Sequence, residues 1–217
     1  MTTRLLVARH GNTFSPGDIL CRVGAGTDIP LVESGCRQGR LLGQFLAKEN
    51  LIPDLVYSSR LKRAVETAQL ALAEMPLPAP LTLRQDDIFN EIDYGIDEGK
   101  PEDEVIARLG ADALKAWDQD AIVPAGWKVD PQALIQNWLD FGAEIAQKHA
   151  GKTVLVVTSN GIARFAPYLT GDFDGFKAQH NIKLSTGAVS RLDYDGKNWH
   201  TVFWNEPPKK YINAVYV

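Results

Sequence analysis

Two short apolar segments, each running into polar residues and a glycine, constrain the fold of this chain most strongly. Residues 4–8 (RLLVA) stop at residues 9–11 (RHG), and residues 152–157 (KTVLVV) stop at residues 158–161 (TSNG). Near-continuous apolar runs of this length are typical of strands that are buried on both faces of a parallel sheet. Because parallel strands are joined by crossover helices, the chain is predicted to be an α/β protein.

Further segments have the periodicity or the turn residues of regular elements. They are predicted as helices at 34–50, 61–74 and 131–149, and as strands at 53–57, 81–84, 189–194 and 199–204. We therefore expect a three-layer sandwich, in which helices flank a mostly parallel sheet within one domain spanning residues 1–217.

The segment from about 101 to 130 is predicted to be an inserted helical cap that covers the functional site described below. Its helical pattern is broken by Pro124-Ala125-Gly126, and no motif in it indicates the shape of a pocket. The apolar residues Trp117, Trp127 and Trp138 fit the core, the cap or a subunit interface, and a homo-oligomer is left open.

Charge and composition exclude several classes of protein. The formal net charge is −4 and basic residues form no block, so nucleic-acid binding is not expected. No apolar run approaches the roughly 20 residues that span a bilayer, and the first residues lack the long apolar region and the small-residue cleavage site expected of a signal peptide. Cys21 and Cys36 form no CxxC motif, which argues against a disulfide framework or a zinc site. We expect a cytoplasmic protein with no metal and no cofactor.

Three predicted strand ends carry unusual polar content: residues 9–13 (RHGNT), Ser58-Ser59 followed by Arg63, and residues 158–161 (TSNG). The carboxyl ends of parallel strands open onto one crevice, so Arg9, His10 and Arg63 are predicted to meet there. Arginine donates paired hydrogen bonds to phosphate oxygens and keeps its charge, and backbone N–H groups near the glycines add fixed donors. The sequence thus predicts a phosphate site.

His10 differs from the other three histidines because it lies at a strand end, between Arg9 and Gly11. A neutral imidazole can attack phosphorus and form a phosphohistidine. The alternative for a single histidine is a hydrogen-bonded structural residue. The neighbouring arginine and glycine favour the nucleophile.

Four segments, in order, resemble the histidine phosphatase, or phosphoglycerate mutase-like, superfamily. Residues 6–13 (LVARHGNT) resemble its "LVRHGxT" signature. Residues 27–35, 56–68 and 91–99 resemble its later segments, so the resemblance covers nearly the whole chain. It implies a metal-independent phosphatase acting on a small phosphorylated substrate.

The resemblance also implies roles for individual residues. His10 would be the phosphorylated nucleophile, Arg9 and Arg63 would clamp the phosphoryl oxygens, and Glu91 would protonate the leaving oxygen. The implied substrate- or phosphate-binding residues are Arg9, Asn12, Thr13, Arg63, Ser159 and Asn160.

The chain departs from the family at its second histidine. Counted back from Arg164, Ser159 occupies that position and Asn160 that of a glycine. A serine hydroxyl is a shorter, neutral donor, so hydrolysis is predicted to be slow, although Asn160 could supply an amide donor. Pro16 and the segment after Glu91 disfavour a mutase and resemble the phosphatase branch.

Two alternatives remain at this point. One is a catalytically weakened protein that binds phosphate esters without turning them over. The other is a nucleotide-cofactor enzyme, prompted by residues 24–27 (GAGT), but these follow no buried strand and lack a third glycine. Arg22, Arg60 and Lys100 could select the rest of a substrate, but are expected on the solvated surface.

Overall fold

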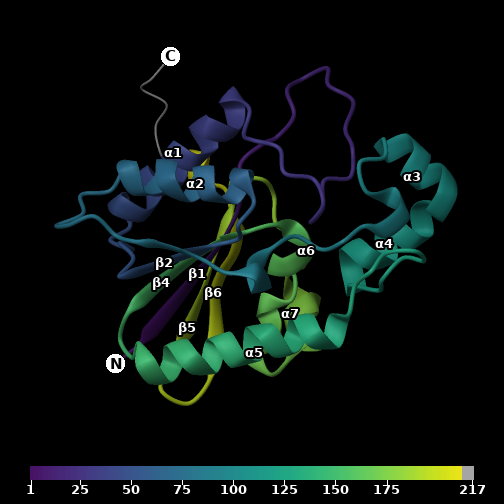
Figure 1. Cartoon of the computed structure of the whole chain (residues 1–217). Coiled ribbons are helices and arrows are strands. Elements are labelled where there is room, and N and C mark those ends of the chain that lie inside the picture. The colour runs from purple at the N-terminus through teal and green to yellow at the C-terminus, as the bar shows by residue number, and fades with distance from the viewer. Residues whose placement is uncertain (212–217) are drawn as a thin grey trace.

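The computed structural model describes residues 1–211, so the last six residues of the expected domain lie outside the described residues. One sheet of six strands runs through the molecule, in the order β3-β2-β4-β1-β5-β6 (Figure 1). The strands are β1 (Thr3–Arg9), β2 (Leu55–Ser58), β3 (Leu83–Gln85), β4 (Thr153–Thr158), β5 (Val189–Tyr194) and β6 (Trp199–Glu206).

The strand directions confirm a mixed but mostly parallel sheet. β1, β2, β3 and β4 pair in parallel, whereas β5 pairs antiparallel with both β1 and β6. In the centre of the sheet Arg9 of β1 lies opposite Thr158 of β4. The two polar strand ends predicted from the sequence therefore lie side by side.

Helices cover both faces of the sheet (Figure 1). The helices α1 (Glu33–Lys48) and α2 (Lys62–Ala73) lie on one face, and α5 (Pro131–Lys148), α6 (Asn160–Ala163) and α7 (Phe173–Gln179) on the other. Short 3₁₀ turns occur at Asp87–Phe89, Gly95–Asp97, Ala166–Thr170 and Pro208–Lys210. The expected three-layer α/β sandwich is confirmed.

Alternate side chains of β1 enter two separate cores. Leu6 and Ala8 pack with the residues of α1 and α2, and Leu5 and Val7 pack with those of α5 and the segments after β4. All four are fully buried, and each buried leucine or valine contributes about 1.5–3 kcal/mol by leaving water. This burial on both faces fixes the register of the strand that ends at His10.

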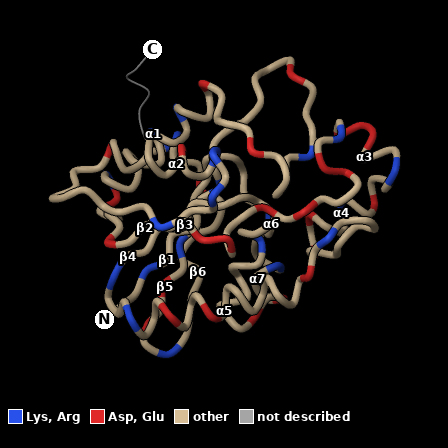
Figure 2. The backbone as a smooth tube through the Cα atoms, in the orientation of Figure 1, with Lys and Arg blue, Asp and Glu red and all other residues tan. Residues whose placement is uncertain are grey.

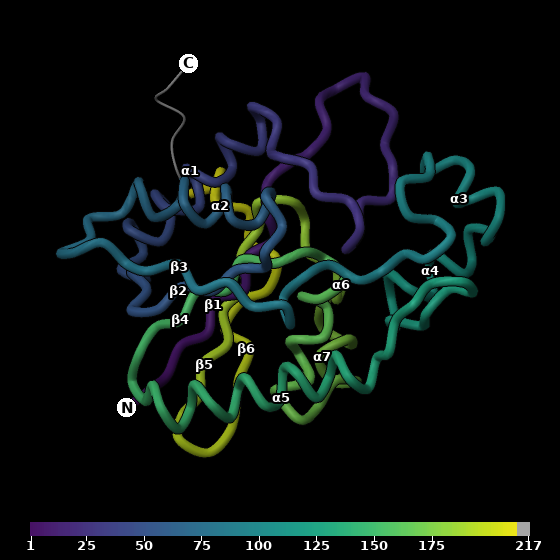
Figure 3. Tube along the Cα trace, in the orientation of Figure 1, coloured from purple at the N-terminus to yellow at the C-terminus, as the bar shows by residue number. Residues whose placement is uncertain are grey.

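The expected cap consists of α3 (Glu102–Leu109) and α4 (Ala111–Asp120), joined to α5 by a long loop. Figure 3 shows this segment beside the loop that follows β1. A bridge between Cys21 and Pro101, together with the Arg22 N–H donating to Lys100 O (2.9 Å), connects the two. The cap therefore contacts the loop that begins at the predicted phosphate site.

The three tryptophans left open by the sequence belong to the core. Trp117, Trp127 and Trp138 expose at most 7% of their surface. The Trp127 indole N–H donates to the carboxylate of Asp97 (2.7 Å), and the guanidinium of Arg108 donates to the same carboxylate. These contacts attach the cap to the body of the protein.

Acidic and basic residues are interspersed along the backbone in the view of Figure 2. Among residues 1–211, no helix combines the length and the apolar character needed to cross a membrane.

Candidate active site

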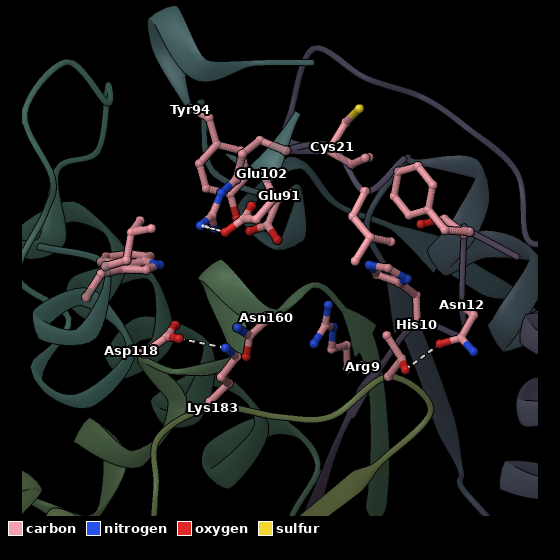
Figure 4. Close-up of a pocket in the computed structure, with 18 of the residues that line it drawn as sticks. Arg9, His10, Asn12, Cys21, Glu91, Tyr94, Glu102, Asp118, Asn160 and Lys183 are labelled. Carbon is pink, nitrogen blue, oxygen red and sulfur yellow. Dashed lines mark hydrogen bonds and ion pairs between the residues drawn. The ribbon is translucent and has the colours of Figure 1, made fainter. Parts of the chain in front are cut away.

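A cavity of about 740 Å³ opens at the carboxyl ends of β1 and β4. Its walls come from the end of β1, the loop after it, the cap, the start of α6 and the segment 183–186. Figure 4 shows Arg9, His10, Glu91 and Asn160 around the same space. The structure thus brings together most of the residues that the sequence singled out.

His10 is held at the wall of the cavity by its backbone and by its own ring. Its N–H donates to Thr158 O and its carbonyl accepts from the Gly187 N–H, both at 3.0 Å. The ring Nδ1 lies 2.7 Å from Gly11 O. Because a carbonyl oxygen can only accept, Nδ1 carries the ring proton, and Nε2 keeps its lone pair.

The surroundings of His10 keep the imidazole neutral. Burial lowers its pKa well below the ordinary value of 6.5, and the charges of Arg9 and Arg63 lower the pKa further. Gly11 makes the turn possible because a side chain there would meet the backbone of Gly35, 2.8 Å from its Cα. The result is an unprotonated ring nitrogen beside two guanidinium groups.

Arg9 lines the cavity and is only partly bonded to protein. Its Nη1 donates to Leu184 O (2.7 Å), while its Nε is buried without a hydrogen-bond partner in the described residues. Burial lowers the pKa of Arg9 from its ordinary value. A buried donor without a partner is costly, so this guanidinium is suited to an anion that enters the cavity.

Arg63, in the first turn of α2, is fully buried and bonded to backbone carbonyls. Its guanidinium donates to Thr27 O (2.7 Å) and Gly24 O (3.1 Å), and its buried Nε has no partner in the described chain. Arg63 is not a cavity-lining residue, but its charge reaches His10. The structure therefore places it behind the wall rather than in open contact with the cavity.

Glu91 lines the cavity, and its carboxylate contacts the start of α6. Its carboxylate accepts hydrogen bonds from the backbone N–H of the next residue, Ile92 (2.9 Å), and from the backbone N–H of Gly161 (3.3 Å). A side chain at position 161 would meet Glu91 Oε1 and would lie 2.9 Å from Ile92 Cγ1. Glycine at this position is what lets the carboxylate approach the start of α6.

Ser159 and Asn160 face different surroundings. Asn160 lines the cavity, and its Oδ1 accepts from the Leu184 N–H (2.8 Å), which leaves its amide N–H groups for the cavity. The Ser159 hydroxyl is fully buried, has no partner in the described residues and does not line the cavity. The structure thus brings Asn160, and not Ser159, to the predicted site.

Asn12 and Thr13 line the cavity beside His10, as expected. Asn12 is fixed by its N–H, which donates to Gln38 Oε1 (2.7 Å), and by its amide, which donates to Ser34 Oγ (3.2 Å). The Thr186 hydroxyl donates to its Oδ1. Both residues remain candidates for binding a phosphoryl oxygen.

The expectation that Arg22 lies on the solvated surface is wrong. Its side chain is 17% exposed and lines the cavity, with its guanidinium near the rings of Tyr94 (5.5 Å) and Trp127 (5.3 Å). Arg60 and Lys100 are exposed, as expected, and pair with acidic residues outside the cavity. Arg22 is partly buried because the cap contacts the loop that carries it.

Several cavity residues were assigned no role from the sequence: Tyr94, Glu102, Asp118, Arg164 and Lys183. Arg164 is 1% exposed, stacks over the Trp117 ring at 3.9 Å and donates to Asn160 O (3.2 Å). Burial lowers its pKa to about 10, so it remains charged at neutral pH. The available signals were the use of Arg164 as the reference residue for the family string and the position of Tyr94 within the segment 91–99.

Comparison with known proteins decides the family. The family model for the histidine phosphatase superfamily (branch 1) matches residues 5–207. The chain belongs to this superfamily. A 2,3-bisphosphoglycerate-dependent phosphoglycerate mutase from Leifsonia xyli is 26% identical over 243 residues, covering 98% of this chain and 95% of that protein.

Solved structures of similar length share the fold of this chain. A phosphoglycerate mutase from Bacillus anthracis has a TM-score of 0.76 at 24% identity, covering 94% of this chain and 93% of its own. A mycobacterial glucosyl-3-phosphoglycerate phosphatase in complex with VO3 has a TM-score of 0.75 at 22% identity, covering 93% and 98%. Both phosphatases and mutases thus resemble this superfamily member.

Within residues 1–211, no group of three or more His, Cys, Asp or Glu side chains is arranged to hold a metal ion.

Proposed function

We propose that this histidine phosphatase superfamily member hydrolyses phosphomonoesters through a phosphohistidine on His10. The observation that supports this most directly is the state of the imidazole. Its Nδ1 is engaged by Gly11 O, and its low pKa keeps Nε2 unprotonated beside guanidinium groups. A neutral nucleophile next to fixed positive charge is what attack on an anionic phosphoryl group requires.

In the first step, His10 Nε2 forms a bond to phosphorus while the bond between phosphorus and the leaving oxygen breaks. Arg9 neutralises charge on the phosphoryl oxygens by direct contact, and the charge of Arg63 acts from behind the wall. Protonated Glu91 transfers its proton to the leaving oxygen, which departs as an alcohol.

In the second step, a water molecule attacks phosphorus and gives a proton to the Glu91 carboxylate. The bond between phosphorus and His10 Nε2 breaks, and inorganic phosphate is released with the imidazole again neutral. Over one turnover the ester and water give alcohol and phosphate, and Glu91 ends protonated as it began. No metal or cofactor is needed in this sequence.

The main alternative is a catalytically weakened protein that binds phosphate esters without turning them over. It is favoured by the absence of the family's second histidine, since the cavity holds the amide of Asn160 and the Ser159 hydroxyl is buried away from it. Phosphoglycerate mutase activity is a third candidate, supported by the mutases among the relatives and disfavoured by Pro16.

Rapid-quench experiments with a radiolabelled phosphomonoester test the proposal. We expect an acid-labile, base-stable phosphoenzyme in the wild type and none in His10→Ala, with turnover lost in that variant. An ester that binds with measurable affinity but forms no phosphoenzyme and releases no phosphate would identify a binding protein. Release of phosphate by His10→Ala at the wild-type rate would refute the mechanism.

A further inference from the structure

The wall of the cavity away from His10 contains charged side chains that the proposed chemistry does not use. In Figure 4, Glu102 lies with Tyr94 and Glu91 on one side of the cavity, and Asp118 and Lys183 lie on another. Since Glu91 protonates the leaving oxygen, the space between these residues is where the leaving group extends.

Arg22 is a hydrogen-bond donor on the leaving-group side of the cavity. Its guanidinium donates to Glu102 Oε1 at 2.6 Å, and its Nε is buried without a partner in the described residues. A buried N–H without an acceptor is unfavourable unless a ligand supplies one. An oxygen atom of the leaving group is the acceptor that this position can receive.

Every cation on the leaving-group side already has a carboxylate nearby. Arg22 pairs with Glu102 at 2.6 Å, Lys183 pairs with Asp118 at 2.6 Å, and Arg164 lies 3.7 Å from Asp118. A second anion in the substrate would lie near Glu102 or Asp118, and these carboxylates would weaken its attraction to the cations they already face. Hydroxyl groups can bond to both members of such an ion pair, so the carboxylates do not oppose them.

We propose that Arg22, held by Glu102, selects phosphomonoesters whose leaving group is uncharged and bears hydroxyl groups, such as polyol or sugar phosphates. This inference rests on the proposed function. Arg22 contacts the leaving group, whereas Glu102 acts by neutralising and positioning Arg22. The cap takes part in selection because Glu102 is the first residue of α3.

Glycerol 3-phosphate and 3-phosphoglycerate test the proposal because they share a carbon skeleton and differ in one group, a hydroxymethyl against a carboxylate. We expect wild-type kcat/KM to favour glycerol 3-phosphate by at least about tenfold. In Glu102→Gln, the uncompensated guanidinium attracts the carboxylate, so the preference shifts toward 3-phosphoglycerate by about tenfold or more.

Arg22→Gln is expected to lower kcat/KM for glycerol 3-phosphate about tenfold, mainly through KM. The matched controls are Arg40→Gln and Glu74→Gln, an arginine–glutamate pair between α1 and the end of α2, away from the cavity. These controls should leave the ratio of the two substrates unchanged within about twofold.

p-Nitrophenyl phosphate separates a failure of this inference from a failure of the proposed function. If p-nitrophenyl phosphate is hydrolysed but the wild type prefers 3-phosphoglycerate, or Glu102→Gln leaves the ratio unchanged, the role of Arg22 is refuted and the chemistry stands. If no ester is hydrolysed, the proposed function fails, and the ratio of Kd values for the same two esters decides the role of Arg22.

Discussion

Replacing Gly161 with alanine tests whether Glu91 acts as the acid. The added methyl would meet Glu91 Oε1 and would lie 3.1 Å from Glu91 Cδ and 2.9 Å from Ile92 Cγ1, whereas ordinary contact begins near 3.4 Å. Because Ile92 packs in the core, the carboxylate is the group that can move. Restoring normal separation displaces it by about 1 Å.

A displacement of this size is enough to disable proton transfer. A misplacement of about 1 Å can cost roughly a hundredfold in rate, and general acid catalysis contributes about a hundredfold or more. We therefore expect kcat for glycerol 3-phosphate, whose alkoxide must be protonated, to fall about a hundredfold. p-Nitrophenolate leaves without a proton, so kcat for its ester should fall at most about tenfold.

Steady-state kinetics on both esters, with Glu91→Gln as the reference for loss of the acid, provide the assay. Gly26→Ala is the control, because its methyl would lie 3.6 Å from Glu98 in ordinary contact. The fold should survive in Gly161→Ala, since alanine favours the helix by about 1 kcal/mol relative to glycine and offsets part of the clash. An equal loss on both esters, or no loss on either, would refute the assignment of Glu91.

Three further predictions follow from the same geometry. Asn160→His should change phosphatase activity by less than about tenfold, because it exchanges one neutral N–H donor in the cavity for another. Ser159→His should lower the free energy of unfolding by about 1–3 kcal/mol because its position is closed; activity assays and urea titration compare the two variants. The His10 imidazole should stay neutral below pH 6.5, its ordinary pKa, and NMR titration that finds it protonated at that pH would contradict the structure. Asp97→Asn should lower the free energy of unfolding by about 2 kcal/mol. The hydrogen bond from Arg108 lowers the pKa of Asp97 below its ordinary value of 3.8, so the stabilisation in the wild type is complete above pH 3.8 and is lost as the pH falls below it. Urea titrations of both proteins at several pH values would show this dependence.

The sequence was sufficient to predict the sheet because the apolar runs that form β1 and β4 are buried on both faces, a pattern with few alternatives. The bounds of the helices α1, α2 and α5 differ from the predicted ones by at most two residues. The position of His10 followed directly, since a residue at the end of a central parallel strand must lie at the crevice.

The choice between Ser159 and Asn160 could not be made from spacing alone. Matching residues by their distance from Arg164 assigns Ser159 to the histidine position, but side chains alternate at the end of a strand. In the structure Ser159 is still extended (φ −110°, ψ 166°) and Asn160 begins α6. The hydroxyl therefore points into the protein and the amide into the cavity.

Arg22 and the leaving-group side of the cavity were beyond sequence reasoning for a different reason. Arg22 and Glu102 lie 80 residues apart and meet only because the cap packs against the loop after β1. Arg22 lies in a loop with no periodic pattern, and charged residues in loops are usually solvated. Only the assembled structure shows that this arginine is covered.

Positive charge at this site comes from arginines, since neither position 159 nor position 160 is a histidine. Arg9 and Arg164 line the cavity and Arg63 lies behind its wall; burial lowers the pKa of each, to about 10 for Arg164, which therefore stays charged at neutral pH. A histidine beside these groups would resist protonation, because nearby like charges lower an imidazole pKa. Asn160 supplies a neutral N–H donor at every pH. Neither Ser159 nor Asn160 exchanges a proton near neutral pH, so turnover in the proposed reaction should depend on fixed charge and on proton transfer by Glu91.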